Sequence, residues 1–136
     1  MAWLIKGNTN ISSSDITVAG NLNLDSTNGD IDIDSSSPIT NNSGFITIEG
    51  NANTVSINST INDSVNRKGS LEKNGKGTLT INNNSYLNEV TLNEGQTDVK
   101  GNIYLLNNFH VEGNVNDGRK VVLNLDKNKT ISTEGT

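Results

Sequence analysis

The chain has 136 residues, no cysteine, one histidine and a formal net charge of −5. Without cysteine it has no disulfides, zinc–thiolate sites or cysteine nucleophiles. The basic residues are scattered singly and only two Tyr, two Phe and one Trp are present, so the basic stripe and aromatic platform of nucleic-acid binding are missing. No stretch approaches the roughly 18 apolar residues that cross a bilayer. These features predict one domain that binds no nucleic acid and does not span a membrane.

Polar turn formers dominate the composition, with 25 Asn, 14 Ser, 14 Thr and 13 Gly against three Ala and one Pro. This mixture favours turns and strands over helices. Leu, Ile, Val and Phe account for 35 of the 136 residues, which is above the roughly 20% below which disorder becomes the expectation. We therefore expect a folded chain with a narrow aliphatic core.

A short pattern returns along the chain: two aliphatic residues separated by one residue, closed off by Asn, Gly, Asp or Ser. In chain order it occupies residues 16–18, 22–24, 31–33, 46–48, 55–57, 79–81, 90–92 and 121–125. Alternation at period two puts the aliphatic side chains on one strand face. The predicted inward residues are Ile16, Val18, Leu22, Leu24, Ile31, Ile33, Ile46, Ile48, Val55, Ile57, Leu79, Ile81, Val90, Leu92, Val121, Leu123 and Leu125. Strands this short must stack on one another.

The spacing of the pairs favours an all-β solenoid, a parallel β-helix with two to three short strands per coil. Between residues 16 and 57 successive pairs begin between 6 and 15 residues apart, which suits coils with loops of variable length. Coils of roughly 20 to 25 residues would make about six coils. Residues 63–76 are poor in aliphatics, and we expect a projecting loop there or a short strand around Leu71. Residues 1–136 are thus predicted to be one β-helix segment of a longer exported protein.

An antiparallel meander is the alternative architecture. Asn28-Gly29 lies between the pairs at 22–24 and 31–33, as a two-residue hairpin turn would. Most other turns carry several Asn and Ser and no compact turn signal. Asparagine suits solenoid corners because it tolerates left-handed backbone angles and its amide can bond to stacked amides. The sequence favours the solenoid without excluding the meander.

Residues 69–95 carry a family resemblance. In order they hold Leu71, Lys73, two Gly flanking one residue, an aliphatic pair, Tyr86, a second aliphatic pair and a Gly. This order resembles the β-strand repeat of autotransporter passenger domains, although Asn88 and Val90 stand where that repeat commonly has Gly and Thr. Residues 21–25 and 28–33 resemble more loosely the filamentous-haemagglutinin-like, high-molecular-weight adhesin family exported by two-partner secretion. Both resemblances imply a right-handed parallel β-helix, secreted or displayed on a Gram-negative cell surface.

Catalytic motifs are scarce in the sequence. His110 is the only histidine, and its place between Phe109 and Val111 predicts an outward-facing strand residue rather than a catalytic base. No serine lies in a Gly-x-Ser-x-Gly elbow and no Gly-rich phosphate loop precedes a helix. We expect neither enzymatic activity nor a cofactor.

Asp30, Asp32 and Asp34 recur at every second residue and form an acidic row. On a strand the three carboxylates would lie about 7 Å apart along one face. Calcium ligands normally converge from a loop with a glycine at its turn. We expect the row to be solvated and to hold no metal.

Six asparagines lie in Asn-x-Ser/Thr sequences, a number near that expected by chance for so much Asn, Ser and Thr. The resemblance to the high-molecular-weight adhesins, whose asparagines are hexosylated before export, is what makes them candidate glycosylation sites. The candidates are Asn10, Asn41, Asn58, Asn62, Asn83 and Asn128.

Two functions fit these features. The chain is an adhesin segment that attaches to a host-cell receptor or glycan or to the same protein on another cell, or it is a passive spacer that carries a functional domain elsewhere in the parent protein. Glycan sites usually include an exposed aromatic ring, and Trp3, Tyr86, Tyr104 and the two Phe are the candidates. Neither end shows a polar cap, so we also expect self-association through open β-helix ends.

Overall fold

The computed structural model describes residues 2–7, 9–13, 16–18, 20–113 and 115–134. Within these residues the regular structure is β apart from one 3-10 turn, η1 (Val115–Asp117). The predicted all-β class is therefore confirmed.

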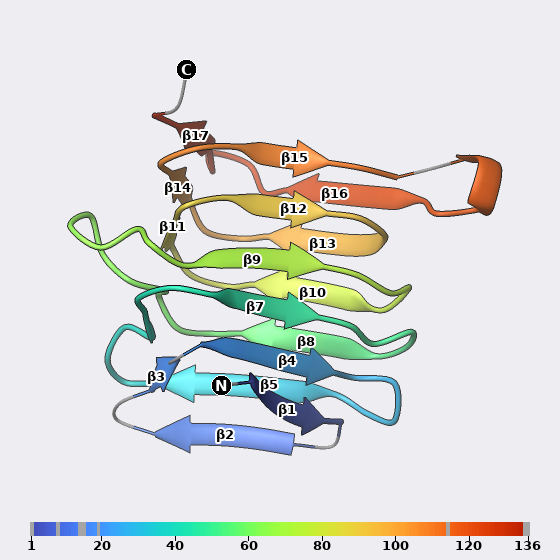
Figure 1. The fold of residues 1–136 in the computed structure, drawn as a ribbon, viewed down its shortest axis with the longest axis horizontal. Coiled ribbons are helices and arrows are strands. Elements are labelled where there is room, and N and C mark those ends of the chain that lie inside the picture. The colour runs from blue at the N-terminus through green and yellow to red at the C-terminus, as the bar shows by residue number, and fades with distance from the viewer. Residues whose placement is uncertain (1, 8, 14–15, 19, 114, 135–136) are drawn as a thin grey trace.

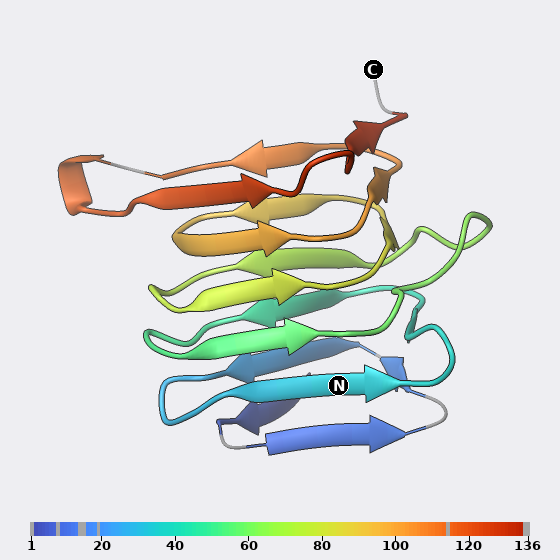
Figure 2. The same ribbon diagram turned by 180° about the vertical axis from the view of Figure 1, so that it is seen from behind.

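Two six-stranded parallel sheets lie face to face and form the body of the molecule. The first sheet is nearer the viewer in Figure 1 and the second in Figure 2. In spatial order the first sheet holds β1 (Ala2–Lys6), β4 (Asn21–Asp25), β7 (Phe45–Ile48), β9 (Ser70–Lys73), β12 (Val90–Leu92) and β15 (Phe109–Val111). The second holds β2 (Thr9–Ser13), β5 (Ile31–Ser35), β8 (Thr54–Ile57), β10 (Thr78–Ile81), β13 (Gly95–Val99) and β16 (Val121–Leu125).

A third, shorter side lies where the chain passes from the second sheet back to the first. A two-stranded sheet joins β3 (Thr17–Val18) and β6 (Thr40–Asn41), and parallel bridges link Ile39 to Ile61 and Ile61 to Ser85. The third sheet continues from there with β11 (Ser85–Leu87), β14 (Ile103–Leu105) and β17 (Ile131–Thr133). All these pairings are parallel.

Strand register excludes the antiparallel meander for the described strands. The residues at 22–24 and 31–33 belong to different sheets, so the Asn28-Gly29 turn joins β4 to β5 across the core rather than within a hairpin. Paired residues lie a full circuit of chain apart, from 18 residues between Leu79 and Thr97 to 28 residues between Ile103 and Ile131. The chain visits the sheets in turn and comes back one strand further along.

The aliphatic core fills the space between the sheets, largely as the alternation predicts. Thirteen of the predicted inward residues are buried: Val18, Leu22, Leu24, Ile31, Ile33, Ile46, Ile48, Val55, Ile57, Leu79, Ile81, Val90 and Leu92. Ile16 and Val121 are partly buried against this core. Leu123 and Leu125 lie on the predicted inward face but are 36% and 44% exposed. Register places them on the inward face of β16, beside Thr97 and Val99, but β16 is the outermost strand of its sheet and its inward side is left partly uncovered.

Seven further residues of the buried core are not among the predicted inward residues. They are Ile39, Ile61, Leu71, Leu87, Val99, Ile103 and Leu105. Most stand as single aliphatic residues, which give no alternation signal. Ile103 and Leu105 do form a pair, with Tyr104 rather than a small polar residue between them.

The segment at 63–76 contains both a loop and a strand. Strand β9 pairs with β7 and β12 inside the first sheet, and residues 63–69 form the loop that leads into it, at the left of Figure 1. Asp63 holds the loop in shape, since its Oδ1 accepts hydrogen bonds from the backbone N of Val65 (2.9 Å) and Asn66 (3.0 Å). Val65 at the loop tip is 92% exposed.

Candidate functional site

The outermost layer at the C-terminal side of the stack holds three of the seven exposed large apolar side chains among the described residues. We call β15, β16 and β17 the end layer. Val111, Leu123 and Leu125 on its strands are 48%, 36% and 44% exposed. Phe109, Val121 and Ile131 are partly buried against the core beneath. Aliphatic side chains that would be covered in any inner layer therefore face solvent here.

Two inward columns of side chains cross the whole stack and end in this layer. Strand register gives the first column as Ile5, Leu24, Ile48, Lys73, Leu92 and Val111. The second column is Ile11, Ile33, Ile57, Ile81, Val99 and Leu125. Each column begins with a partly buried isoleucine and ends with an exposed aliphatic residue. The two ends of the stack therefore present aliphatic side chains at the same two column positions.

The strands of the outer layers also leave backbone groups on open edges. In the first sheet β15 pairs with β12 alone, and in the second β16 pairs with β13 alone. At the opposite edges β1 pairs with β4 alone and β2 with β5 alone. Open parallel edges of this kind are templates for a further strand.

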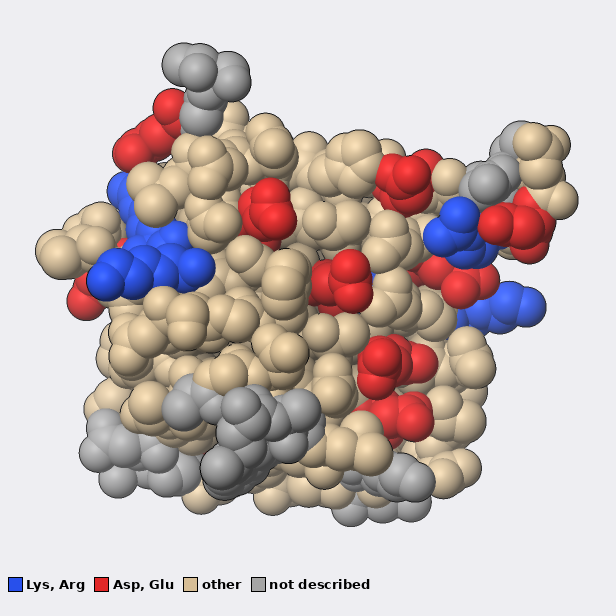
Figure 3. All heavy atoms as spheres, in the orientation of Figure 1, with Lys and Arg blue, Asp and Glu red and all other residues tan. Residues whose placement is uncertain are grey.

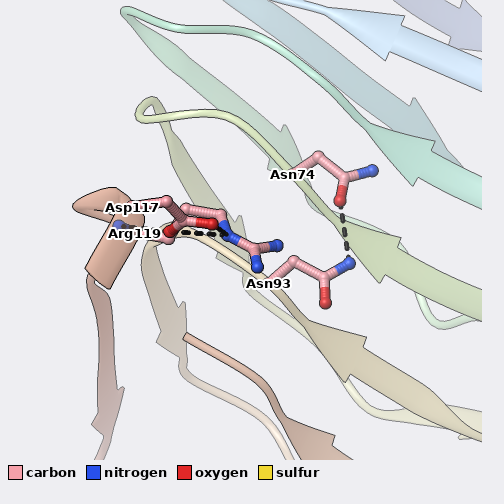
Figure 4. Close-up of polar contacts among 4 residues, drawn as sticks. All are labelled: Asn74, Asn93, Asp117 and Arg119. Atoms are coloured by element: carbon pink, nitrogen blue, oxygen red, sulfur yellow. Dashed lines mark hydrogen bonds and ion pairs between the residues drawn. The ribbon is translucent and has the colours of Figure 1, made fainter. Parts of the chain in front are cut away.

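A longer loop, with described residues 112–113 and 115–120, projects from the end layer between β15 and β16, at the right of Figure 1. A hollow of about 660 Å³ beside it is lined by Val111, Glu112, Gly113, Gly118, Arg119, Lys120 and Val121. Arg119 Nε donates to both carboxylate oxygens of Asp117 at 3.1 Å (Figure 4). This hydrogen bond lowers the pKa of Asp117. The bonds within 117–119 stabilise the loop on itself.

Side-chain amides form the asparagine ladders expected from the composition. Asn82 Nδ2 donates to Asn58 Oδ1 (2.6 Å), and Asn58 Nδ2 donates to Asp34 Oδ1 (2.8 Å), which links three layers of the stack. Asn93 Nδ2 donates to Asn74 Oδ1 (2.8 Å), as Figure 4 shows. Among the described asparagines, Asn53, Asn62 and Asn128 adopt positive φ. Much of the amide surface is therefore engaged between layers of the same molecule.

The outer face of the first sheet is acidic. Asp25, Glu49 and Glu72 lie on or beside β4, β7 and β9, and Figure 3 shows acidic side chains spread over this face with Lys and Arg at its two sides. Two such faces brought together would repel each other. The acidic face therefore disfavours lateral pairing of two copies through the first sheet.

The acidic row does not converge on one point. Asp30 Oδ1 accepts from the backbone N of Thr54 (2.9 Å), Asp34 accepts from Asn58, and Asp32 lies beside Ser56 on the outer face of the second sheet. Asp30 is exposed, and Asp32 and Asp34 are half-buried. In the described part of the chain no three His, Cys, Asp or Glu side chains come together in a group that could hold a metal ion.

We expect EDTA to leave the melting temperature of the chain unchanged, since each carboxylate of the row that is bonded accepts from the neighbouring strand. Differential scanning fluorimetry with and without EDTA measures the melting temperature. A third sample receives calcium at about 5 mM, a large excess over ordinary site affinities. A clear loss of stability on chelation that calcium restores would show that the row binds the ion.

The six candidate glycosylation sites differ sharply in accessibility. Asn41 and Asn62 are buried, and Asn62 Nδ2 already donates to the backbone O of Asn41 (2.9 Å) and of Tyr86 (3.1 Å). Asn58 is half-buried within its ladder. The exposed sites are Asn10, Asn83 and Asn128. Modification of the folded chain would have to use one of these three.

Two of the aromatic candidates, Tyr86 and Tyr104, stack on each other, whereas Phe45 on β7 is 39% exposed. Tyr86 and Tyr104 are paired in register on β11 and β14, with ring centroids 4.8 Å apart and an interplanar angle of 15°. The Arg67 guanidinium lies 5.7 Å from the Tyr86 centroid, and its Nη1 is 2.9 Å from Glu134 Oε1. Loop 63–69 is thereby fastened over the third sheet. The side chain of Trp3 lies outside the described part of the structure.

His110 is exposed on β15, and its Nε2 is hydrogen-bonded to the carboxylate of Glu112, the residue just after the end of this strand. Both side chains point to the outer face of the first sheet, away from the columns of the core. Register places Thr91 of β12 beside His110.

Lys73 is a buried structural residue that the sequence alone does not identify. It is fully buried at an inward position of β9, and its Nζ donates to the backbone O of Asn74 (2.9 Å), Gly75 (2.7 Å) and Glu94 (3.1 Å). Burial lowers the pKa of Lys73 to about 8, against the opposing effect of the Glu94 charge. A Cβ at Gly95 would lie 2.4 Å from the backbone O of Gly75, and its φ is +81°, so this position requires glycine. Lys73 ties the turn after β9 to the turn before β13.

Comparison with protein-family models, curated proteins and solved structures finds no match for this chain. A search of the described residues for a helix long and apolar enough to cross a membrane finds none.

Proposed function

We propose that this chain is a right-handed parallel β-helix of about six coils and that it serves as a structural and binding segment of a secreted or surface-exposed bacterial adhesin. The six strands in each large sheet and the full-circuit register support the coil arrangement. Parallel strands joined across a sheet almost always follow right-handed connections. The resemblance of residues 69–95 to the autotransporter passenger repeat, and of the rest to the high-molecular-weight adhesins, supplies the link to adhesion.

Self-association is the binding activity that we propose for the segment. The observation that carries it is the exposure of Val111, Leu123 and Leu125 on an outermost layer with open strand edges. Burying such side chains is worth about 25 cal/mol per Å², and each open edge offers backbone hydrogen bonds to a further strand.

A passive spacer is the second candidate function, and the amide ladders favour it. Because Asn82, Asn58 and Asp34 bond to one another between layers, these side chains stiffen the stack instead of facing a ligand. Attachment to a host-cell receptor or glycan is the third candidate function. Of the three functions, only the first requires that the isolated chain associates with itself.

We expect the weight-average mass to rise from the monomer value of 14.5 kDa to at least twice that over a hundredfold increase in protein concentration. Analytical ultracentrifugation measures this directly. Added salt should change the association little, since apolar and backbone contacts are weakly screened. A strictly monomeric chain at the highest concentration would rule out self-association and leave the spacer or a host ligand.

A further inference from the structure

We propose that copies of this chain join head to tail, with the β1 and β2 edges of one copy seated on the end layer of the next. This inference rests on the proposed self-association and specifies its geometry. The end layer of one copy is covered by a second copy, because the core columns continue across this contact and the strands keep their direction.

Both columns continue across such a junction with like side chains. The first column ends at Val111 and would resume with Ile5 of the next copy, and the second ends at Leu125 and would resume with Ile11. Inside the molecule the same step places Leu24 on Ile48 and Ile57 on Ile81. The partly buried Ile5 and Ile11 and the exposed Val111 and Leu125 would then become core residues of a continuous stack.

The outer rows also continue. On the second sheet Asn10 heads a row that passes through Asp32, Ser56, Thr80 and Asp98 to Asn124. A head-to-tail contact would put Asn10 of one copy beside Asn124 of the other. This is the amide pair that Asn58 and Asn82 already form between layers.

Backbone direction distinguishes this contact from pairing of like ends. Strands of one sheet all run the same way, so a copy added head to tail pairs β2 with β16 in the parallel manner of every described pair. Two like ends would have to pair in antiparallel fashion. The open edge of β2 has free backbone groups at Asn10 and Ser12. Thr9 N donates to the backbone O of Asp30 (3.1 Å), the residue before β5, so the N–H and C=O groups of Asn10 and Ser12 point to the opposite, open side.

The edge strand β16 of the end layer also has backbone groups that point to its open side. Asp126 N donates to Val99 O (2.9 Å) and Lys120 O accepts from Gly95 N (2.8 Å), which turns the backbone groups of Leu123 and Leu125 to the open side of β16. A contact between two different surfaces does not close on itself, so it produces chains that lengthen with concentration rather than a closed dimer.

Two variants that each disable one end test the geometry. Leu125→Asp places a charge on the exposed end of the second column, and Asn10→Pro removes an open-edge N–H while keeping the β2 to β5 bonds. Asn83→Asp is the matched control, since it adds the same charge at an exposed turn in the middle of the stack. Circular dichroism melts verify that all three variants are folded like the parent chain.

Head-to-tail joining predicts that each end variant alone is monomeric by ultracentrifugation at concentrations where the parent and Asn83→Asp associate. Their equimolar mixture should form a species of twice the monomer mass and nothing larger. Association of Asn10→Pro by itself, with no new species in the mixture, would show that like ends pair and would overturn this inference alone. A monomeric parent chain would instead overturn the proposed self-association and this inference with it.

Discussion

Replacing Ile81 by aspartate should leave the chain unfolded. Ile81 is fully buried in the second column, between Ile57 and Val99. An aspartate there would bury a carboxylate with no partner, at a cost of several kcal/mol in either ionisation state, which is comparable with the roughly 5–15 kcal/mol that holds a domain folded. Circular dichroism and urea titration of the purified variant measure the loss.

Thr78→Asp is the control for this change. Thr78 lies on the same strand but faces outward between Thr54 and Gln96, so the added charge stays in water. Its stability should remain close to that of the parent. A soluble and cooperatively folded Ile81→Asp chain would contradict the column arrangement of the core.

Replacing Lys73 by methionine should lower stability by about 2 kcal/mol or more. Methionine keeps the apolar stem but leaves the carbonyl oxygens of Asn74, Gly75 and Glu94 without the donor they now share. Each unpaired buried acceptor costs about 1–3 kcal/mol, which outweighs the relief from no longer burying a charge. Lys76→Met, at an exposed position three residues away, is the control and should be nearly neutral. A Lys73→Met chain as stable as the control would show that the three hydrogen bonds contribute little.

The difference in free energy of unfolding between the parent chain and Lys73→Met should depend on pH. Burial lowers the pKa of Lys73 to about 8 from an ordinary value of 10.5. Between these values the unfolded chain binds more protons than the folded chain, so the contribution of Lys73 to stability rises with pH from 8 to 10.5. The free energy of unfolding of the parent, minus that of Lys73→Met, should therefore increase across this window. A difference that stays constant or falls would contradict the lowered pKa.

Local alternation was enough to predict strands and their inward faces, because period two is a property of a few adjacent residues. Ile31-Asp-Ile33 and Leu79-Thr-Ile81 show this directly, since their aliphatic residues are buried and the residues between them are not. The exposure of Leu123 and Leu125 was not predictable in the same way. Their sequence is like that of the inner strands, and burial depends on what lies on the next layer.

The residues of the third side and Lys73 show two other limits of sequence reasoning. Ile39 and Ile61 enter the core through isolated parallel bridges, which leave no periodic trace. Lys73 stands two residues after Leu71, so alternation does place it inward, yet a charged side chain at that position normally indicates solvent. The three carbonyl partners that make its burial tolerable come from turns on two different layers.

The direction of the backbone hydrogen bonds has a mechanical consequence. They run along the stack, from layer to layer, so a force that pulls the first and last strands apart loads the bonds of one layer at a time. Opening one layer frees between 18 and 28 residues, a length of about 60–100 Å when extended. The Arg67 to Glu134 pair lies across the layers near the end of the stack and resists the first of these steps. Such a molecule yields to tension by lengthening in increments, while its remaining layers stay intact and able to close again.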